Sequence, residues 1–360
     1  MSSSSALSGF KKNSFINIAL ILIGFAIVYF RSNFSGLTIE IVLFILSLIV
    51  LVRAADIFTD AAVILGERMG LSKLNTGILI IAIGTSAPEL FSSVGAAMQG
   101  QPDMVVGNVL GTVVANCLLG IGIATLFAKQ ALDVHREVIS TQMSMFFVAV
   151  LLTSLSLYDG HMSQLEGGLL LVVLGFYLHH NIRHSGGETA LEEHADVEQI
   201  DTQETKDSDS ATISTPLLSV FLLINLACLF ISGDFVVSSL LNSAEALGLS
   251  SAKLATSVLA IGTSIPEIAT AIMLVRKNNT DSLFGEIIGS NIFDYLGIFG
   301  VIALINPITM SGPLLNFLIL SSIAAFCLLY IIMNDRKVRR IEGIALLALF
   351  AGFLIQLVSI

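Results

Sequence analysis

AIGTSAPE, at Ala82 to Glu89, and AIGTSIPE, at Ala260 to Glu267, are two copies of one phrase that differ at one position. Each copy lies within an apolar run, where a carboxylate is costly unless it serves an ion or proton pathway. The proline of each copy removes a backbone donor and breaks the helix. Carbonyls, hydroxyls and a carboxylate beside such a break are the hard oxygen ligands that Na⁺ and Ca²⁺ prefer. The phrases therefore predict a cation site built from two broken helices.

The composition predicts the class of protein. The chain has 360 residues, of which 55% are hydrophobic and 12% are charged, and its mean hydropathy is +0.90. These values indicate an all-α polytopic membrane protein. The cysteines Cys117, Cys228 and Cys327 lie scattered in apolar runs and form neither a disulfide framework nor a zinc motif. No basic patch with interleaved aromatic residues is present, so we expect a lipid bilayer and no nucleic acid as partner.

The apolar runs predict about eleven membrane-spanning helices. The first follows Lys11 and Lys12 and has no clear small-residue cleavage site, so we expect it to be retained. Two spans of up to about 30 residues would be up to about 45 Å long as helices, against a hydrocarbon core of about 30 Å, and are expected to tilt strongly or to run past the membrane edge. These long spans are Ile39–Leu65 and Leu217–Leu247, and the other nine are Phe15–Phe30, Leu74–Met98, Met104–Phe127, Val138–Leu157, Met162–Ile182, Ala252–Val275, Leu283–Ile305, Leu314–Ile332 and Ile341–Val358.

The basic residues predict the orientation of these spans. With Lys11 and Lys12 in the cytoplasm, fourteen of the 17 Lys and Arg residues fall on the cytoplasmic side. Arg31 and Lys253 would lie outside, and Arg53 lies within a span. This asymmetry is the one that the positive-inside rule requires. We therefore expect a multi-pass protein of the cell membrane, with a cytoplasmic N-terminus and an external C-terminus.

The duplication extends beyond the quoted phrases and predicts the domain organisation. At the offset that separates Ala82 from Ala260, Asp56 matches Asp234, Gly107 matches Gly285, and Asn116 aligns with Asp294. Gly120 would then face Ile298, which indicates a slip of the register after Asn116. We expect an extra N-terminal segment (residues 1–36), a first repeat (37–182), a cytoplasmic linker (183–214) and a second repeat (215–360). Each repeat has five spans, an odd number, so the two copies are inverted in the membrane.

The linker is predicted to be a disordered tether. Residues 186–210 contain nine acidic residues and one base, Lys206, with few aromatic residues. A weak regulatory cation site in this stretch is the alternative interpretation.

A second pair of motifs adds oxygen-bearing side chains to the expected site. GNVLGTVVANCLLG occupies Gly107 to Gly120, and GEIIGSNIFDYLG occupies Gly285 to Gly297. Helical spacing places Thr112 with Asn116, and Ser290 with Asp294, on one face of each helix. Close helix packing through small residues would explain one such motif alone. Two copies at one offset, each beside a glutamate, favour cation ligands instead.

These paired motifs resemble the alpha-repeats of sodium/calcium exchangers, in the Ca²⁺/cation antiporter superfamily, and most closely its prokaryotic type. The resemblance covers the chain from Ile39 onward without the linker. It implies alternating access, in which the two long helices slide over a core of eight. It also implies that the two glutamates bind both ions and that neighbouring hydroxyls, carbonyls and amides complete the sites. The implied ligands are Glu89, Glu267, Thr85, Ser86, Thr263, Ser264, Thr112, Asn116, Ser290 and Asp294.

Some positions depart from the pattern of that family. Glu286 stands where the first repeat has Asn108. We interpret it as a charge at a helix start, favoured by the helix dipole, with a peripheral cation or proton contact as the alternative. Arg53, Asp56 and Asp60 lie three and four residues apart, which predicts a local ion pair rather than ion ligands.

The predicted function is antiport of Ca²⁺ against Na⁺, with no enzyme activity and no cofactor. Two glutamates neutralise Ca²⁺, and an empty pair of buried carboxylates is costly, so another cation must replace the one that leaves. Asn116 and Asp294 stand where proton-coupled branches of the superfamily tend to carry Gln, which favours Na⁺. The alternatives are a Ca²⁺/H⁺ antiporter, a K⁺-dependent Na⁺/Ca²⁺ exchanger, a cation channel and an intramembrane protease.

Overall fold

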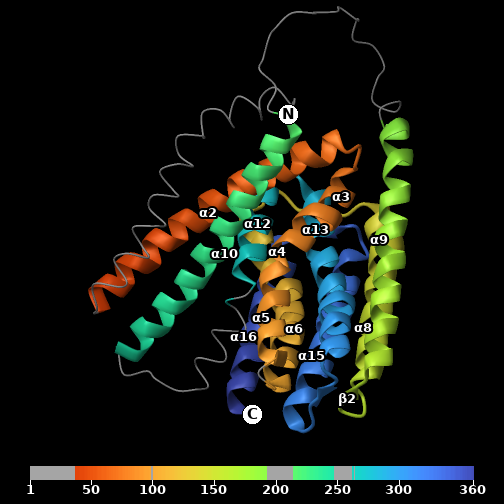
Figure 1. The fold of residues 1–360 in the computed structure, drawn as a ribbon. Helices are drawn as coiled ribbons and strands as arrows, with labels where there is room; N and C mark the ends of the chain where they lie inside the picture. Colours follow the sequence, from red (N-terminus) through yellow and green to blue (C-terminus); the bar gives the residue numbers. More distant parts are fainter. Residues whose placement is uncertain (1–36, 99, 193–213, 247–261, 263) are drawn as a thin grey trace, which may run out of the picture.

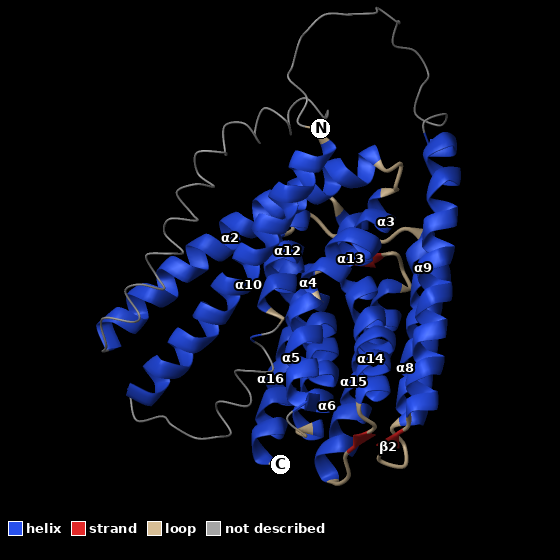
Figure 2. Ribbon diagram, viewed as in Figure 1, coloured by secondary structure: helices blue, strands red, loops and turns tan. Residues whose placement is uncertain are grey.

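The computed structural model describes residues 37–98, 100–192, 214–246, 262 and 264–360 (Figure 1). The predicted span Phe15–Phe30 and most of the acidic linker lie outside these residues. The described part is built from helices, with four strands of two residues each (Figure 2). The helical class predicted from composition is therefore confirmed.

The described residues include nine helices that are long and apolar enough to cross a membrane. They match nine of the eleven predicted spans, and the span predicted at Ala252–Val275 lies partly outside the description. In chain order the helical elements are α2 (Leu37–Arg68), α3 (Lys73–Thr76), η1 (Gly77–Ala82), α4 (Ile83–Thr85), α5 (Ala87–Met98), α6 (Pro102–Val114), η2 (Ala115–Gly120), α7 (Ile121–Phe127), η3 (Val138–Gln142), α8 (Met143–Ser156), α9 (Gln164–Glu192), α10 (Thr215–Ala246), α12 (Ile265–Arg276), α13 (Thr280–Phe293), η4 (Asp294–Ile298), α14 (Phe299–Ile305), α15 (Pro313–Met333) and α16 (Arg340–Ser359), where η denotes a π-helix.

The helix boundaries repeat at the offset of the sequence motifs. Both ends of α10 lie at this offset from the ends of α2. The segment from the start of α13 to the end of α14 lies at the same offset from the segment that runs from α6 to α7. The register slip that we predicted after Asn116 is therefore wrong as far as Phe127. The slip was suggested because Gly120 has no glycine opposite it in the second repeat. The packing does not require glycine at this position, because a Cβ at Gly120 would meet its nearest neighbours at ordinary contact distances of 3.7 and 3.9 Å.

The two long helices α2 and α10 pack side by side and run obliquely to the other long helices (Figure 1). Each has 32 residues, which corresponds to about 48 Å. Their tilt relative to the membrane stays a prediction. The outer face of α2 exposes Ile41, Ile45 and Ile49, as expected for a surface that meets lipid.

Two glycine-to-glycine contacts join helices of the two repeats. A Cβ at Gly122 of α7 would lie 3.1 Å from the carbonyl oxygen of Gly343 of α16, and a Cβ at Gly167 of α9 would lie 3.0 Å from that of Gly300 of α14. Small residues let helix backbones approach this closely, which is the usual packing device in membranes. Each repeat thus contributes one outer helix that packs against the other repeat.

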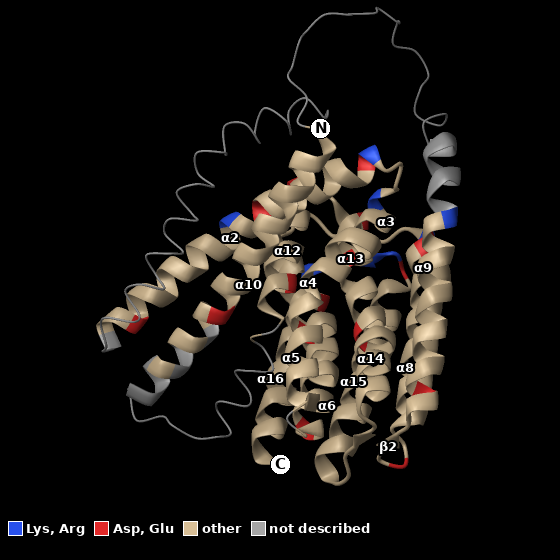
Figure 3. Ribbon diagram, viewed as in Figure 1, with Lys and Arg blue, Asp and Glu red and all other residues tan. Residues whose placement is uncertain are grey.

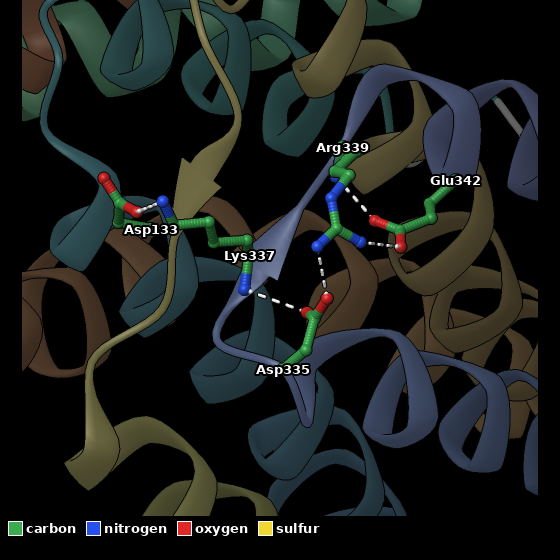
Figure 4. Close-up of polar contacts among 5 residues, drawn as sticks. All are labelled: Asp133, Asp335, Lys337, Arg339 and Glu342. Atoms are coloured by element: carbon green, nitrogen blue, oxygen red, sulfur yellow. Dashed lines mark hydrogen bonds and ion pairs between the residues drawn. The ribbon is translucent and has the colours of Figure 1, made fainter.

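The four short strands also link the two halves of the chain. β1 (Leu132–Asp133) pairs antiparallel with β4 (Lys337–Val338), and β2 (His161–Met162) pairs antiparallel with β3 (Ile308–Thr309). The Lys337 ammonium lies 3.8 Å from an Asp133 carboxylate oxygen across the first pair (Figure 4). These pairings fix the connections between helices at each end of the molecule.

Ion pairs also order the turn between α15 and α16. The Arg339 guanidinium lies 2.7 Å from Asp335 and 3.2 Å from Glu342 (Figure 4). The Lys337 backbone N–H donates to Asp335 at 3.1 Å. This hydrogen bond, followed by the contacts with Arg339, lowers the pKa of Asp335 below its ordinary value. The turn is exposed, so its charges guide the chain locally without adding much stability.

Basic side chains gather toward the end of the molecule where α2 ends and α10 begins (Figure 3). Acidic residues, by contrast, also occur at the opposite end, near β2. The distribution is the asymmetry on which the predicted orientation rests.

The start of α13 packs tightly against α3 and η1. The Ser282 hydroxyl donates to the Lys73 carbonyl at 2.8 Å. A Cβ at Gly285 would meet the Leu74 carbonyl oxygen and would lie 3.2 Å from the Gly77 Cα. At the equivalent position of the first repeat, a Cβ at Gly107 would meet no heavy atom within 4 Å. The start of α13 is therefore tightly packed at Gly285, whereas the equivalent position on α6, Gly107, has free space beside it.

This difference predicts opposite tolerance of alanine at two equivalent glycines. Gly285→Ala should destabilise the protein by about 1–3 kcal/mol, because the new methyl group overpacks a backbone contact. Gly107→Ala should be neutral or slightly stabilising, because alanine favours helix more than glycine does. Apparent midpoints of thermal unfolding in one detergent compare the two variants. Equal midpoints would contradict the described packing of α13 on α3.

Candidate cation-binding site

Two helix breaks place the repeated glutamates. The first break is at Ser86, with φ −80° and ψ 2°, between α4 and α5. The second is at Ser264, with φ −82° and ψ 0°, directly before α12. Glu89 and Glu267 lie in the first turns of α5 and α12. A helix N-terminus carries free backbone donors and a partial positive charge, so both carboxylates lie where negative charge is stabilised.

The partner helices are distorted at the other predicted ligands. Asn116 lies in the π-helix η2, and Asp294 begins the π-helix η4. Single π-helical turns inside α-helices occur frequently at functional sites. Thr112 is fully buried one turn before Asn116 on α6, and Ser290 is fully buried one turn before Asp294 on α13.

The three carboxylates Glu89, Glu267 and Asp294 are buried, with exposed fractions of 0%, 2% and 0%. None of their six oxygens accepts a hydrogen bond of good geometry in the described part of the protein, although the backbone N–H groups of Glu89 and Glu267 approach their own carboxylates. A buried carboxylate without donors is costly, and in membranes such groups mark ion or proton pathways. The cluster therefore fits a cationic ligand.

Electrostatic contacts show that the carboxylates of the two repeats lie near one another. Asp294 interacts with Glu89 and with Glu267, and Glu267 also interacts with Glu89. The Ser86 hydroxyl faces Asp294, although the two do not meet strict hydrogen-bond geometry. The phrase of the first repeat and the second motif of the other repeat thus contribute to one cluster.

Amides and hydroxyls complete the surroundings of the cluster. The Asn116 amide nitrogen donates to the Ser290 hydroxyl at 3.4 Å and to the Asn291 side-chain oxygen at 3.3 Å. The Asn116 side-chain oxygen is left without a partner among the described residues, as are the hydroxyls of Ser86 and Ser264. The Thr85 hydroxyl donates to the carbonyls of its own preceding turn. Neutral oxygens therefore lie on the same helical segments as the carboxylates, and one of them, the Ser86 hydroxyl, faces Asp294.

The predicted ligands are placed as follows. The structure brings together Glu89, Glu267, Asp294, Ser86, Asn116 and Ser290 and buries Thr85, Thr112 and Ser264 on the same helices, whereas Thr263 lies outside the described residues. Among the described residues, no three Asp, Glu, His or Cys side chains converge tightly enough to hold a metal by themselves. A cation here would need hydroxyl, amide, carbonyl or water oxygens as well. Asn291, whose side chain contacts both Asn116 and Cys117, was missed, although it stands within the quoted GEIIGSNIFDYLG motif.

Two expectations about acidic residues are wrong. Glu286 is not at a helix start, because α13 begins at Thr280 and Asn279 caps it by accepting from the Ser282 N–H at 3.3 Å. Asp56 and Asp60 do not pair with Arg53. Both lie against Lys277, whose ammonium is 2.8 Å from Asp56 and 2.9 Å from Asp60. Sequence spacing along α2 gave no sign of a partner that comes from the other repeat.

Ion pairs and hydrogen bonds of Lys277 connect α12, the helix that carries Glu267, to the long helix α2. Lys277 follows the last residue of α12 and also donates to the Asp56 carbonyl at 2.6 Å and to the Thr59 hydroxyl at 2.8 Å. The side chains in the pair are only 25–32% exposed, so solvent screens the pair less than it would a surface pair.

The fold and this cluster define a multi-pass membrane protein with buried carboxylates from two broken helices and a distorted partner helix. The model of the sodium/calcium exchanger protein family matches residues 39–183 and 217–358. The chain therefore belongs to the sodium/calcium exchanger family and is a membrane antiporter of cations. This confirms the family that the paired motifs resemble.

Individual relatives agree with this assignment. The inner membrane protein YrbG of Escherichia coli is 31% identical over 267 residues, which are 74% of this chain and 79% of YrbG. The sodium/calcium exchanger MaX1 of Methanosarcina acetivorans is 26% identical over 359 residues, covering 89% of this chain and 99% of MaX1. A solved structure of the sodium-calcium exchanger NCX_Mj has the same fold, with a TM-score of 0.69 at 24% identity over 88% of this chain and 98% of that one.

The contact of Lys277 with α2 generates a test by double-mutant cycle. Lys277→Met, Asp60→Asn and the double variant should show a coupling energy of about 0.5–3 kcal/mol. Lys277→Met leaves Asp60 partly buried without its cation, and Asp60→Asn removes one of the two carboxylates that hold Lys277. Chemical unfolding in detergent measures the three differences. Arg276→Met, a change at the adjacent exposed base, is the control. Additive effects of the two single changes would contradict the ion pair.

Proposed function

We propose that this protein exchanges Ca²⁺ for Na⁺ across a membrane by alternating access. The observation that carries the proposal is the buried cluster of Glu89, Glu267 and Asp294, whose oxygens lack partners among the described residues. Side chains from both repeats meet there, near the breaks of two helices. Ca²⁺ takes six to eight oxygens, and the carboxylates with the neighbouring hydroxyls and amides supply oxygens of the required kind.

Charge balance supplies the coupling between the two ions. Two unit charges 4 Å apart repel by about 4 kcal/mol at an effective dielectric constant of about 20. Ca²⁺ or Na⁺ removes this cost, and the site has no Lys or Arg ion pair among the described residues to do so. The protein can change the access of a site that is neutralised by a bound cation, because no uncompensated charge then passes the apolar barrier. An empty site with charged carboxylates cannot change its access in this way. Exchange of one ion for the other follows.

Differences in exposure between the repeats support alternating access. Ser92 is exposed and Asn108 is partly exposed, whereas their equivalents Thr270 and Glu286 are fully buried beneath the contact of α13 with α3. The packing of α13 on α3 closes the path from one side of the membrane to the cluster. With the orientation predicted from the basic residues, this closed side is the cytoplasmic one. The described conformation would then face outward.

The proposal is tested by Ca²⁺ uptake into proteoliposomes. An outward Na⁺ gradient should drive uptake, whereas a pH gradient or a K⁺ gradient of the same size should not. Uptake driven by the pH gradient alone would favour the Ca²⁺/H⁺ antiporter, and a requirement for K⁺ together with Na⁺ would favour the K⁺-dependent exchanger. Uptake that does not saturate and needs no counter-ion would indicate a channel.

The two glutamates should both be essential for this exchange. Glu89→Gln and Glu267→Gln are each expected to reduce Na⁺-driven Ca²⁺ uptake to the level of empty liposomes, because each removes one of the two charges that neutralise Ca²⁺. Both variants should still fold, since a neutral amide is less costly to bury. Glu67→Gln, at an exposed position at the end of α2, is the matched control. Near-normal uptake by either site variant would exclude its carboxylate as a required ligand.

Asp294 is expected to act as a neutral group, like Asn116 at the equivalent position. Three ionised carboxylates would exceed the charge of one Ca²⁺ or two Na⁺, and burial with mutual repulsion favours protonation of one of them. Asp294→Asn should therefore preserve Na⁺-driven Ca²⁺ exchange and the charge moved per Ca²⁺. Current and Ca²⁺ flux recorded together measure both quantities. Lost flux, or a changed ratio of charge to Ca²⁺, would show that Asp294 acts as a charged ligand.

A further inference from the structure

Glu286 takes part in a helix-to-helix contact that both repeats contain. In the first repeat the Asn108 amide of α6 donates to the Ser92 hydroxyl of α5 at 3.2 Å. In the second repeat the Thr270 hydroxyl of α12 donates to Glu286 of α13 at 3.2 Å. The two pairs occupy equivalent positions at the offset of the repeated motifs. Because the first repeat makes this contact with a neutral amide, the contact does not require the charge of Glu286.

The surroundings of Glu286 do not neutralise its charge. Glu286 is fully buried, and its Oε2 atom has no hydrogen-bond partner in the described part of the chain. Neither Lys nor Arg forms an ion pair with it among the described residues. The Glu267 carboxylate lies close enough to repel it. An isolated buried carboxylate of this kind needs a cation or a proton.

Oxygen atoms available for a cation converge beside Glu286. Thr270 contacts both the Glu286 carboxylate and, at 2.9 Å, the Glu267 carbonyl. Both Glu267 carboxylate oxygens and Oε2 of Glu286 are without partners among the described side chains. Glu286, Ser290 and Asp294 follow one another at four-residue spacing on one face of α13, with about 6 Å between successive positions. Glu286 is therefore one helical turn from Ser290 and two turns, about 12 Å along the helix, from Asp294.

We propose that Glu286 and Thr270, with Glu267 shared, form an additional site for one monovalent alkali cation beside the central cluster. The inference rests on the proposed function for the role of that cluster. With Ca²⁺ neutralised by Glu89 and Glu267, Glu286 retains one negative charge, which a single monovalent cation balances. A second Ca²⁺ would need more charge and more oxygens than this corner supplies.

The additional site makes the access paths from the two sides of the membrane chemically different. Glu286 directly follows Gly285, which packs against Leu74 of α3. When this contact opens, Glu286 is the first buried carboxylate that a cation entering there meets. The equivalent place in the first repeat holds the neutral Asn108. A cation bound at Glu286 thus raises by one the number of monovalent cations that the protein holds.

Equilibrium binding of radioactive sodium, and of radioactive rubidium as a congener of K⁺, tests this site. The full-length protein is purified without Ca²⁺ and kept at constant pH and ionic strength with a large organic cation. Glu286→Gln and Glu286→Asn should each bind one monovalent cation fewer than wild type. The isotope that is lost identifies Na⁺ or K⁺ as the occupant. Thr270→Val should weaken binding of that cation by about tenfold, the size expected for one lost contact to a charged group.

Ser92→Ala is the matched control, because it removes the equivalent hydroxyl of the first repeat and should leave the number of bound cations unchanged. Glu286→Asn reproduces the neutral pair of Asn108 and Ser92, so it provides a folded variant if Glu286→Gln is unstable. If the Glu286 variants bind as many Na⁺ and Rb⁺ ions as wild type, the proposal is wrong. This is also the result expected if Glu286 holds a proton instead of a cation.

Measurements on the same wild-type preparation separate this inference from the proposed function. If wild type exchanges Ca²⁺ for Na⁺ but the Glu286 variants lose no bound cation, the additional site is wrong and the exchanger is not. If the variants lose one cation while wild type fails to exchange Ca²⁺, the site stands and the proposed function fails.

Discussion

Buried carboxylates without protein donors impose the constraint on which the rest of this structure depends. Glu89, Glu267 and Asp294 lie inside an apolar bundle with no donor to their oxygens among the described residues. Such a cluster persists only if cations or protons neutralise it and if the surrounding helices lower the cost of its charge. The broken helices lower this cost for the glutamates, because each carboxylate lies at a helix start where the dipole favours negative charge.

Neither repeat could build this cluster alone. Glu89 and Asn116 come from the first repeat, and Glu267, Ser290 and Asp294 come from the second. The contacts that hold the repeats together also come in pairs, namely the two glycine contacts and the two strand pairs, each of which joins one element from each half. The duplicated sequence therefore has two structural roles. It breaks the helices within each repeat, and it provides the paired contacts that join the two halves.

Sequence reasoning predicted what is encoded locally and failed where distant helices meet. Apolar runs and prolines gave the nine described spans and the helix breaks, because hydrophobic length and a missing backbone donor act within one segment. The pairing of Lys277 with Asp56 joins positions 221 residues apart, and no pattern along α2 reveals it. Glu286 was misplaced because the span was predicted to begin at Leu283, whereas α13 begins earlier, at Thr280. The neighbouring Gly285 makes a close contact with α3.

If the protein alternates access as proposed, departures from symmetry between the repeats set the ratio of its two access states. If the repeats were identical, inversion would make the two closed mouths equal in free energy, and neither state would be favoured. Here one mouth is closed by Gly285 on Leu74 and is held to α2 by Lys277, while the equivalent glycine, Gly107, has open space. Each such contact biases the equilibrium by its own free energy, and about 1.4 kcal/mol already changes the ratio of the states tenfold. The unequal residues of the two repeats are therefore the physical origin of any preferred direction of access.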